Sequence, residues 1–394
     1  MRGGTARRIA AAIGVAATLT TALPARAEAP QTFSDVPAEH WARTAIEYVT
    51  DPAHELLPAR QEGFGPGDPL TRRDLARALV RAFPPPSEPV SDRVFEDVAA
   101  DDPLLDAFRW AAKRHFLPVR DGSIKPDAGV TRRVFDPAVV RALGYADEAK
   151  GIATLQTKGG ERVVSGWSTG FVMVAQRLEL YPNLRDEASE LRPSQPLTRA
   201  HAAMALARVH RLIDADEWSI GWRLEGYAEP PLLPTMSPLR LRAVRWAMQH
   251  VAFPYIWGGE WNRATGSGYP YGAQPQGGFD CSGFAWWMLQ ESTANWNVAA
   301  LRGFDGWQLT GRTATDMARN APKKIAFAKT MPMDLAFFEL NGDPSRFEHM
   351  GVLLGNGWMI HSSGSRGGVS LERVDAGYWR ERFAFARRVI PIDA

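Results

Sequence analysis

Hydrophobic residues recur every three or four positions in several short stretches of the first 214 residues, a spacing that places them on one face of a helix. Threonine is a good helix N-cap, because its hydroxyl accepts a hydrogen bond from a backbone amide of the first turn. The pattern therefore predicts capped amphipathic helices wherever a threonine opens such a stretch. Three stretches open with the same pair of residues: Thr71-Arg72, Thr131-Arg132 and Thr198-Arg199.

A second motif accompanies two of these helices and indicates a repeat. Residues 33–36 (Phe-Ser-Asp-Val) and 95–98 (Phe-Glu-Asp-Val) each precede a further amphipathic stretch, so a unit consists of helix, loop and helix. A third unit begins near Trp167 without this opening motif. The predicted units span residues 31–90, 91–150 and 160–214.

The hydrophobic pattern changes after a proline-rich segment at residues 229–238, which we interpret as a linker because proline cannot continue a helix. In residues 239–394 short apolar runs alternate with glycine-rich turns. Two of these runs flank residues 355–357 (Gly-Asn-Gly), and an Asn-Gly pair between apolar runs is a strong signal of a β-hairpin. An apolar helix is predicted to begin at Cys281, after a glycine-containing loop. The second half is therefore predicted to be an α+β domain.

The first 27 residues have the features of a signal peptide. Arg2, Arg7 and Arg8 supply positive charge, an apolar stretch covers residues 9–23, and residues 25–27 (Ala-Arg-Ala) provide the small-x-small pattern of a cleavage site. We therefore expect a secreted protein of the cell wall, the cell surface or the periplasm. No other stretch approaches the roughly 18 apolar residues of a membrane span, so no transmembrane anchor is predicted.

Composition narrows the classes of function. The chain has 394 residues, of which 45% are hydrophobic and 23% charged, as in globular proteins. Its net charge is +2, and loss of the four arginines of the predicted signal peptide would change this to about −2. This balance argues against a nucleic-acid partner, which needs a dense basic surface. The single cysteine excludes an internal disulfide and a cysteine-based zinc site.

That cysteine, Cys281, is the candidate nucleophile. The positive end of the helix dipole stabilises a thiolate, so its position at a helix start predicts a lowered pKa for the thiol. The candidate base is a histidine, since imidazole titrates near neutral pH. His349 and His361 lie on the two strands of the predicted hairpin, so one can accept the proton while the other orients it. No His, Asp or Glu cluster has the spacing of metal ligands.

The first block, residues 31–214, resembles three S-layer homology modules, which open with Phe-x-Asp-Val and close with a Thr-Arg helix. The resemblance implies a mostly helical trefoil that binds a cell-wall polysaccharide or peptidoglycan. It assigns contacts with acidic groups of the polymer to Arg72, Arg132 and Arg199, because a guanidinium fork suits carboxylates. The alternative is that these arginines cap or bridge helices within the trefoil.

The second block, residues 239–394, resembles the NlpC/P60 cysteine peptidases. The resemblance rests on five motifs in order: residues 254–259 (Pro-Tyr-Ile-Trp-Gly-Gly), 279–284 (Phe-Asp-Cys-Ser-Gly-Phe), 334–338 (Asp-Leu-Ala-Phe-Phe), 349–352 (His-Met-Gly-Val) and 359–362 (Met-Ile-His-Ser). It implies a papain-like α+β fold without a metal ion or other cofactor. Two long connections, 260–276 and 291–311, depart from the family pattern and are expected to edge the cleft.

The same resemblance assigns roles to six residues. It implies that Cys281 is the nucleophile, His349 the base and His361 the third polar residue of the triad. Tyr255 is placed near the thiolate and the oxyanion. Asp280 and Ser282 are expected to recognise a free α-amine on the substrate.

Together the two blocks predict an exported cell-wall hydrolase that cleaves peptidoglycan stem peptides. The expected bond is the D,L bond between γ-D-glutamate and a diamino acid, with the repeats holding the enzyme at the envelope. One alternative is an N-acetylmuramoyl-L-alanine amidase. The other is a wall-binding structural protein whose peptidase domain is inactive.

Overall fold

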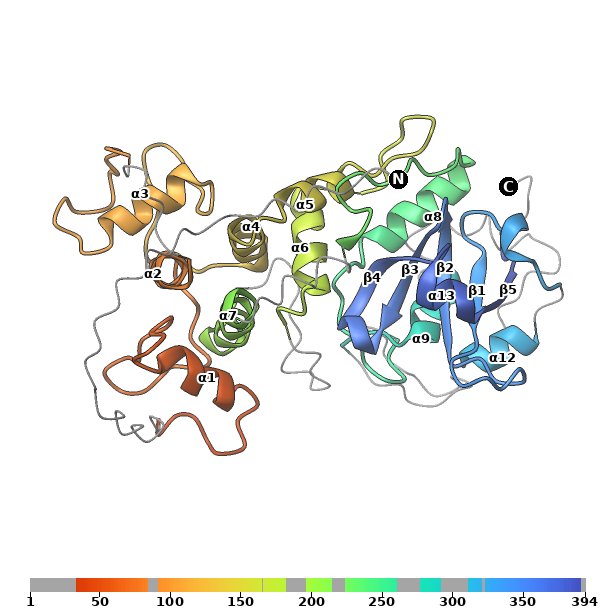
Figure 1. Cartoon of the computed structure of the whole chain (residues 1–394), viewed down its shortest axis with the longest axis horizontal. Helices are drawn as coiled ribbons and strands as arrows, with labels where there is room; N and C mark the ends of the chain where they lie inside the picture. The colour runs from red at the N-terminus through yellow and green to blue at the C-terminus, as the bar shows by residue number, and fades with distance from the viewer. Residues whose placement is uncertain are drawn as a thin grey trace, which may run out of the picture.

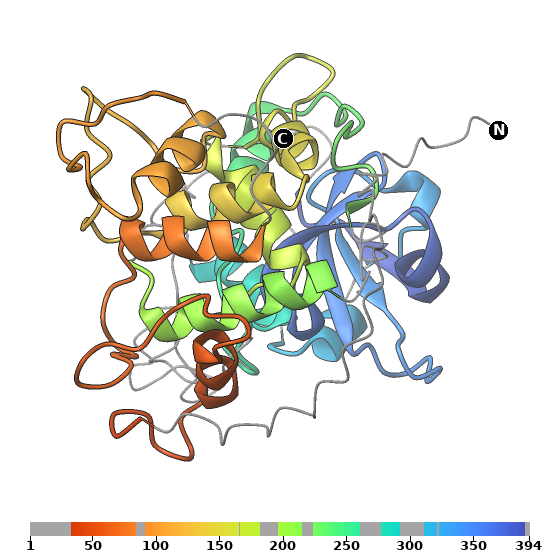
Figure 2. The same ribbon diagram turned by 60° about the vertical axis from the view of Figure 1, so that its left-hand side comes forward.

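The computed structural model describes residues 33–83, 91–164, 166–181, 196–214, 224–260, 277–291, 311–320 and 323–390. A helical region and a sheet-containing domain lie on opposite sides of the molecule (Figures 1 and 2). The predicted signal peptide lies outside the described residues, as do nearly all residues of the two long connections.

The helical region contains seven α-helices in its described part. Thr71, Thr131 and Thr198 stand directly before α2, α4 and α7, so the helix starts predicted from the Thr-Arg pairs are confirmed. At α2 the predicted cap is complete: the Thr71 hydroxyl accepts from the Asp74 amide while the Asp74 carboxylate accepts from the Thr71 amide. The helices are α1 (Arg43–Thr50), α2 (Arg72–Ala82), α3 (Leu105–Lys113), α4 (Arg132–Ala142), α5 (Ala146–Ala153), α6 (Ser168–Arg177) and α7 (Arg199–Asp214).

The three Thr-Arg motifs meet in a closed ring of backbone hydrogen bonds. The Leu70 amide donates to the Leu197 carbonyl, the Leu197 amide to the Val130 carbonyl, and the Val130 amide to the Leu70 carbonyl, each at 2.8 Å. All three residues are fully buried. The three motifs therefore occupy equivalent positions around a pseudo-threefold centre, as a repeat predicts.

The two Phe-x-Asp-Val motifs also play equivalent parts. Asp35 accepts hydrogen bonds from the amides of residues 64 and 65 at 3.0 and 2.7 Å. Asp97 accepts from the amides of residues 124 and 125 at 3.0 and 2.7 Å. Each aspartate thus fixes the turn of its own unit by satisfying backbone donors that no helix or strand pairs.

The C-terminal domain is built on a five-stranded antiparallel sheet of order β4-β3-β2-β1-β5. Helix α9 packs on β2 and β3. The predicted hairpin is confirmed as β2 and β3, and the predicted helix start at Cys281 is confirmed as the first residue of α9. The elements are α8 (Pro238–Met248), α9 (Cys281–Trp286), η3 (Trp287–Glu291), α12 (Ala314–Arg319), η4 (Phe327–Lys329), β1 (Leu335–Phe338), β2 (His349–Gly355), β3 (Trp358–Ser363), η5 (Gly364–Arg366), β4 (Gly368–Arg373), α13 (Gly377–Arg382) and β5 (Phe383–Arg387).

The segment that we interpreted as a linker is docked between the two regions. Leu233 is fully buried, donates its amide to the Gln156 carbonyl and accepts from the Lys158 amide, at 2.9 and 2.8 Å. Just before it, the buried Tyr227 hydroxyl donates to the Leu371 carbonyl of β4 at 2.7 Å. Buried residues of both regions form one continuous hydrophobic cluster. The prolines therefore end a helix here without creating a free tether.

Candidate active site

Cys281 opens α9 under the control of the residue before it. The Asp280 carboxylate is the N-cap of this helix and accepts a hydrogen bond from the Gly283 amide. Position 283 must be glycine, because a Cβ there would collide with the Gly259 carbonyl oxygen. The Cys281 thiol also receives a hydrogen bond from the Met350 amide. This contact brings the sulfur to the start of β2, where His349 precedes Met350.

The two predicted histidines are in direct contact, and a carboxylate extends the chain. His349 Nε2 lies 2.7 Å from His361 Nδ1, across the paired strands β2 and β3. His361 Nε2 lies 3.1 Å from a Glu372 carboxylate oxygen on β4. All three side chains are buried. The ring of Trp379 covers His349 at a centroid distance of 4.7 Å.

This chain determines which nitrogen of His349 can accept a proton. Glu372 accepts only, so the Nε2 of His361 must carry the hydrogen. Neutral His361 then presents a lone pair at Nδ1, and His349 donates its own Nε2 hydrogen to it. The Nδ1 of His349 is left unprotonated. That atom has the lone pair that a general base for the thiol requires.

The ionisation of the three groups agrees with this assignment. Burial lowers the pKa of His349 well below its usual value, assisted by the neighbouring His361. Burial also lowers the pKa of His361, although the hydrogen bond to Glu372 opposes this. Burial disfavours the charged form of Glu372, but the hydrogen bond from His361 and the charge of Arg177 outweigh it and lower the pKa of Glu372. The resting chain is two neutral imidazoles and one carboxylate.

The predicted lowering of the Cys281 pKa is wrong for this state of the site. Burial, with the adjacent Asp280 carboxylate, raises the pKa of the thiol to about 12. Helix α9 has only six residues, so its dipole is too small to offset the loss of water around the sulfur. Cys281 therefore rests as a neutral thiol and needs a base to become a nucleophile.

The Tyr255 segment frames the nucleophile. Tyr255 pairs in a β-bridge with Phe279, two residues before Cys281, and the amide of Ile256 donates to the Phe279 carbonyl at 3.1 Å. The Ser362 hydroxyl donates to the same carbonyl at 2.8 Å, which ties the segment after His361 to the cysteine loop. The structure therefore brings Tyr255 together with the catalytic candidates, as the sequence predicted.

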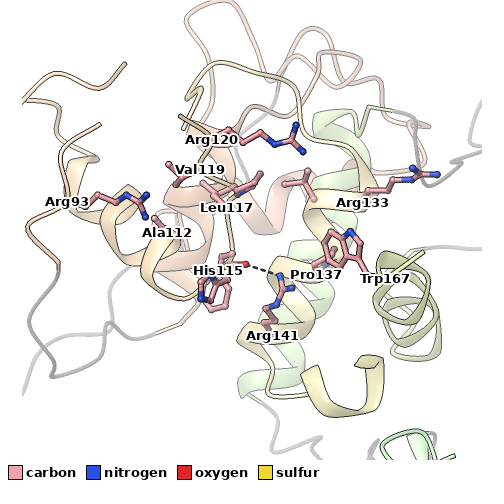
Figure 3. Close-up of a pocket in the computed structure, with 13 residues that line it drawn as sticks. Arg93, Ala112, His115, Leu117, Val119, Arg120, Arg133, Pro137, Arg141 and Trp167 are labelled. Carbon is pink, nitrogen blue, oxygen red and sulfur yellow. Dashed lines mark hydrogen bonds between the residues drawn. The ribbon is translucent and has the colours of Figure 1, made fainter. Parts of the chain in front are cut away.

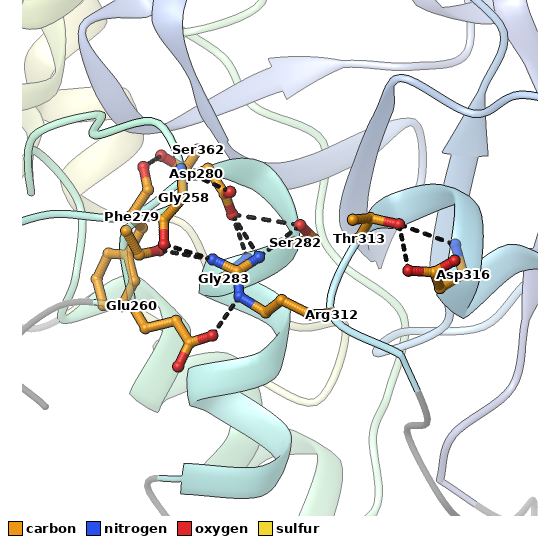
Figure 4. Close-up of polar contacts among 11 residues, drawn as sticks. Gly258, Glu260, Phe279, Asp280, Ser282, Gly283, Arg312, Thr313, Asp316 and Ser362 are labelled. Carbon is orange, nitrogen blue, oxygen red and sulfur yellow. Dashed lines mark hydrogen bonds and ion pairs between the residues drawn. The ribbon is translucent and has the colours of Figure 1, made fainter. Parts of the chain in front are cut away.

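Asp280 and Ser282 contact a cation already present in the protein (Figure 4). Arg312 Nη1 lies 3.1 Å from an Asp280 oxygen and 2.9 Å from the Ser282 hydroxyl. The same guanidinium pairs with buried Glu260 and donates to the Gly258 carbonyl at 2.9 Å. Our expectation of an α-amine site assumed a carboxylate without a cationic partner, and that assumption is wrong. Glu260 is the one residue of the 260–276 connection whose placement the structure describes.

Sequence reasoning missed Glu372, Arg312 and Trp379. Glu372 and Ser370 are polar and buried at alternate positions of β4, where the strand pattern would place solvent-facing residues only if one side of the sheet were open. A buried acidic residue on a strand two positions from another polar one was the available signal. Arg312 and Trp379 act through contacts with distant parts of the chain, and no local pattern points to them.

The arginines assigned to polymer binding serve as internal braces. Arg199 is 1% exposed and donates to the Phe64 and Pro58 carbonyls at 2.9 and 2.7 Å. Arg72 donates to the Ile124 carbonyl at 2.6 Å, the equivalent position of the next unit. Each guanidinium thus holds the turn of a neighbouring unit.

Arg132 is also enclosed within the helical region. It is 4% exposed, pairs with Asp136 at 3.1 Å and lies over the Tyr181 ring at 4.1 Å. Burial and these partners are what a helix-bridging arginine requires. The geometry of all three arginines therefore supports the alternative that they bridge elements inside the trefoil.

A different set of arginines lines a cavity of about 560 Å³ between the second and third units (Figure 3). Arg93, Arg120 and Arg133 are exposed, and the Trp167 ring at its edge is 61% exposed. Arg141 lies over the Phe171 ring at 4.5 Å. None of the described lining residues is acidic. The cavity combines positive charge with an exposed aromatic face.

Two further searches cover only the described part of the chain. There, no group of three or more His, Cys, Asp and Glu side chains is arranged to hold a metal ion. None of the helices within those same ranges is long and apolar enough to cross a membrane.

Residues 252–388 match the family model described as the NlpC/P60 family. A similar protein is the probable peptidoglycan endopeptidase LytE of Bacillus subtilis strain 168, 32% identical over 125 residues, which are 32% of this chain and 31% of the relative. The bifunctional muramidase/DL-endopeptidase CwlT of the same strain is 29% identical over 143 residues, which are 36% of this chain and 34% of the relative. The chain thus spans about a third of the length of these relatives.

An S-layer protein of Bacillus thuringiensis subsp. finitimus is 23% identical over 205 residues, which are 50% of this chain and 24% of that protein. Half of the chain is more than the part that follows residue 251. This match therefore includes residues of the helical region.

Proposed function

Since residues 252–388 are an NlpC/P60 domain, we propose that the chain is a cysteine peptidase that hydrolyses peptidoglycan stem peptides. The observation that carries this proposal is the hydrogen-bonded chain from Glu372 through His361 to His349, which ends beside the helix start of Cys281. This arrangement supplies a nucleophile, a base with a defined lone pair, and a carboxylate that stabilises the base once it is charged.

The reaction follows from these groups. As the Cys281 sulfur attacks the amide carbonyl carbon, its proton passes to Nδ1 of His349, so no free thiolate is required. The imidazolium then donates this proton to the leaving amine, and a thioester remains on Cys281. His349 next takes a proton from water, whose oxygen attacks the thioester and releases the acid. Backbone amides at the start of α9, with Tyr255 beside them, are suited to hold the oxyanion.

The proposed scissile bond is the D,L bond between γ-D-glutamate and a diamino acid. The names of LytE and CwlT, a peptidoglycan endopeptidase and a DL-endopeptidase, support this choice. The Asp280–Arg312 ion pair does not favour a requirement for a free α-amine at the substrate terminus. Stem peptides still attached to the glycan therefore belong to the proposed substrate class.

The helical region is proposed to hold the secreted enzyme at the cell envelope through an anionic wall polymer. Because Arg72, Arg132 and Arg199 are occupied internally, we assign the contact to the cavity with Arg93, Arg120, Arg133 and Trp167. Guanidinium groups bind carboxylates and phosphates, and an exposed indole ring suits the apolar face of a sugar. The match with an S-layer protein supports this role for the helical region.

Mass spectrometry of muropeptides after digestion with the purified protein tests the proposal. We expect fragments cut between D-glutamate and the diamino acid with the native chain and none with Cys281→Ala, whose thiol is missing. Fragments cut between muramic acid and L-alanine would identify an amidase instead. Unchanged muropeptides with the native chain would favour the inactive structural protein.

A further inference from the structure

The catalytic chain does not end within the peptidase domain. Glu372 receives a hydrogen-bonded ion pair from Arg177, the last residue of α6 in the helical region, with Nη1 3.2 Å from Oε1. The side chains of Arg177 and Glu372 are only 4% and 8% exposed. A second arginine, Arg366 of η5, approaches the same carboxylate at 2.8 Å. Glu372 therefore joins His361 on one oxygen to two arginines from different regions on the other.

The contact is part of a packed interface. Helix α6 lies against β4, the edge strand of the sheet that carries Glu372 (Figure 1). Tyr227 is buried beside it and bonds to the Leu371 carbonyl, one residue before Glu372. Its ring also packs against Trp358 at a centroid distance of 5.5 Å. Because these groups are buried, the position of Arg177 is fixed by the docking of the helical region.

We propose that Arg177 is a positioning residue of the peptidase site, so that the activity depends on the docked helical region. This inference rests on the proposed function of the Cys281 site. Arg177 holds the Glu372 carboxylate in the orientation in which its other oxygen accepts from His361. The helical region would then have two tasks, wall attachment and completion of the active site.

The charges around the histidines give the proposal a signed consequence. The groups that face them are Glu372 of β4, Arg366 of η5, Arg177 of α6, the neutral Cys281 thiol of α9 and the neutral Tyr227 hydroxyl. Two arginines offset much of the field of one carboxylate at the imidazoles. Removing one of them leaves Glu372 more negative toward His361 and His349, so both histidines become easier to protonate.

The test uses the full chain with Arg177→Gln, which removes the charge and keeps hydrogen-bond donors. We expect kcat on a stem peptide to fall about tenfold with KM little changed, and the acidic limb of the pH profile to move up by roughly 0.5 to 1 pH unit. Arg177→Lys, which keeps the charge, is expected to retain the native pH profile. Tyr227→Phe removes a hydrogen bond of the same interface without touching Glu372, so it is expected to leave both kcat and the profile as in the native chain.

An NMR titration of the imidazoles of His349 and His361 gives a readout that needs no substrate. An upward shift of their pKa in Arg177→Gln, absent in Tyr227→Phe, supports the proposal even if the native chain does not cleave stem peptides. A folded Arg177→Gln with native titration and native kcat overturns it, as does an equal change in Tyr227→Phe. If Arg177→Gln does not fold, Glu372→Gln is titrated in its place: unchanged histidine pKa values there would also overturn the proposal.

Discussion

At the scale of single residues, the geometry assigns the proton and predicts a pH profile. His349 acts as a base only when neutral, and burial lowers the pKa of His349 well below the usual 6.5. A lowered pKa keeps the imidazole unprotonated to more acidic pH, so kcat/KM should hold its plateau through pH 6 and fall only below it. Measuring kcat/KM on a stem peptide across the acidic and neutral range checks this. A half-maximal point at or above pH 6.5 would contradict the assignment.

The pairing of Asp280 with Arg312 predicts how the enzyme treats the substrate terminus. An unpaired buried carboxylate costs several kcal/mol, and a free α-amine would be strongly preferred if Asp280 had no cation of its own. Because Arg312 already supplies that charge, a free and an N-acetylated stem peptide should differ in kcat/KM by less than about tenfold, or about 1.4 kcal/mol. Parallel assays of L-Ala-γ-D-Glu-diamino-acid peptides with and without the acetyl group measure the ratio. A preference of about 100-fold for the free amine would restore the α-amine pocket.

The catalytic residues were accessible to sequence reasoning to different degrees, for a physical reason. Cys281 and His349 stand at a helix start and a strand start, positions that local hydrophobic patterns reveal. Glu372 and Arg312 reach the site through contacts between segments far apart in the chain, which no periodicity encodes. The thiol pKa failed for a related reason: burial is a property of the folded molecule, and here it outweighs the local helix dipole.

At the scale of secondary-structure elements, the arginines that open α2 and α7 brace neighbouring turns. Arg199→Met would leave the Phe64 and Pro58 carbonyls without their donors, and each buried unsatisfied group costs about 1–3 kcal/mol. We therefore expect a clear fall in melting temperature, measured by circular dichroism. Pelleting with isolated walls below the melting point should change little.

Arg133→Ala is the matched comparison for Arg199→Met. Arg133 is exposed at the cavity, directly after the equivalent arginine of the second unit, so its removal should leave the melting temperature unchanged and weaken wall pelleting. If Arg199→Met abolished pelleting while the protein stayed folded and Arg133→Ala had no effect, polymer binding would return to the Thr-Arg positions.

The elements themselves were largely predictable, because each is announced by a short-range signal. Threonine caps marked α2, α4 and α7, and the Asn-Gly turn marked the hairpin of β2 and β3. The segment at 229–238 was not, since its prolines indicate only that a helix stops. Whether such a segment hangs free or docks depends on partners such as Gln156 and Lys158, which lie more than 70 residues earlier in the chain.

At the scale of the whole molecule, the continuous core predicts that the two regions cannot be separated without cost. Residues 28–228 alone should still pellet with isolated walls, because the proposed polymer site lies within residues 93–167. Residues 237–394 alone should pellet weakly. That piece also lacks Arg177, Tyr227 and Leu233, so it exposes the apolar face that they cover on β4 and leaves Glu372 with one arginine.

We therefore expect residues 237–394 to melt at a lower temperature than the full chain and to cleave soluble stem peptides more slowly, even though every group of the Cys281, His349 and His361 set is present. Comparing kcat on a soluble peptide removes wall attachment from the measurement, so a loss there reports on the site itself. The control is the full chain with Arg133→Ala, which disturbs the proposed polymer site but not the interface and should keep native kcat. Equal kcat and equal melting temperature for the fragment and the full chain would show that the helical region only tethers the enzyme.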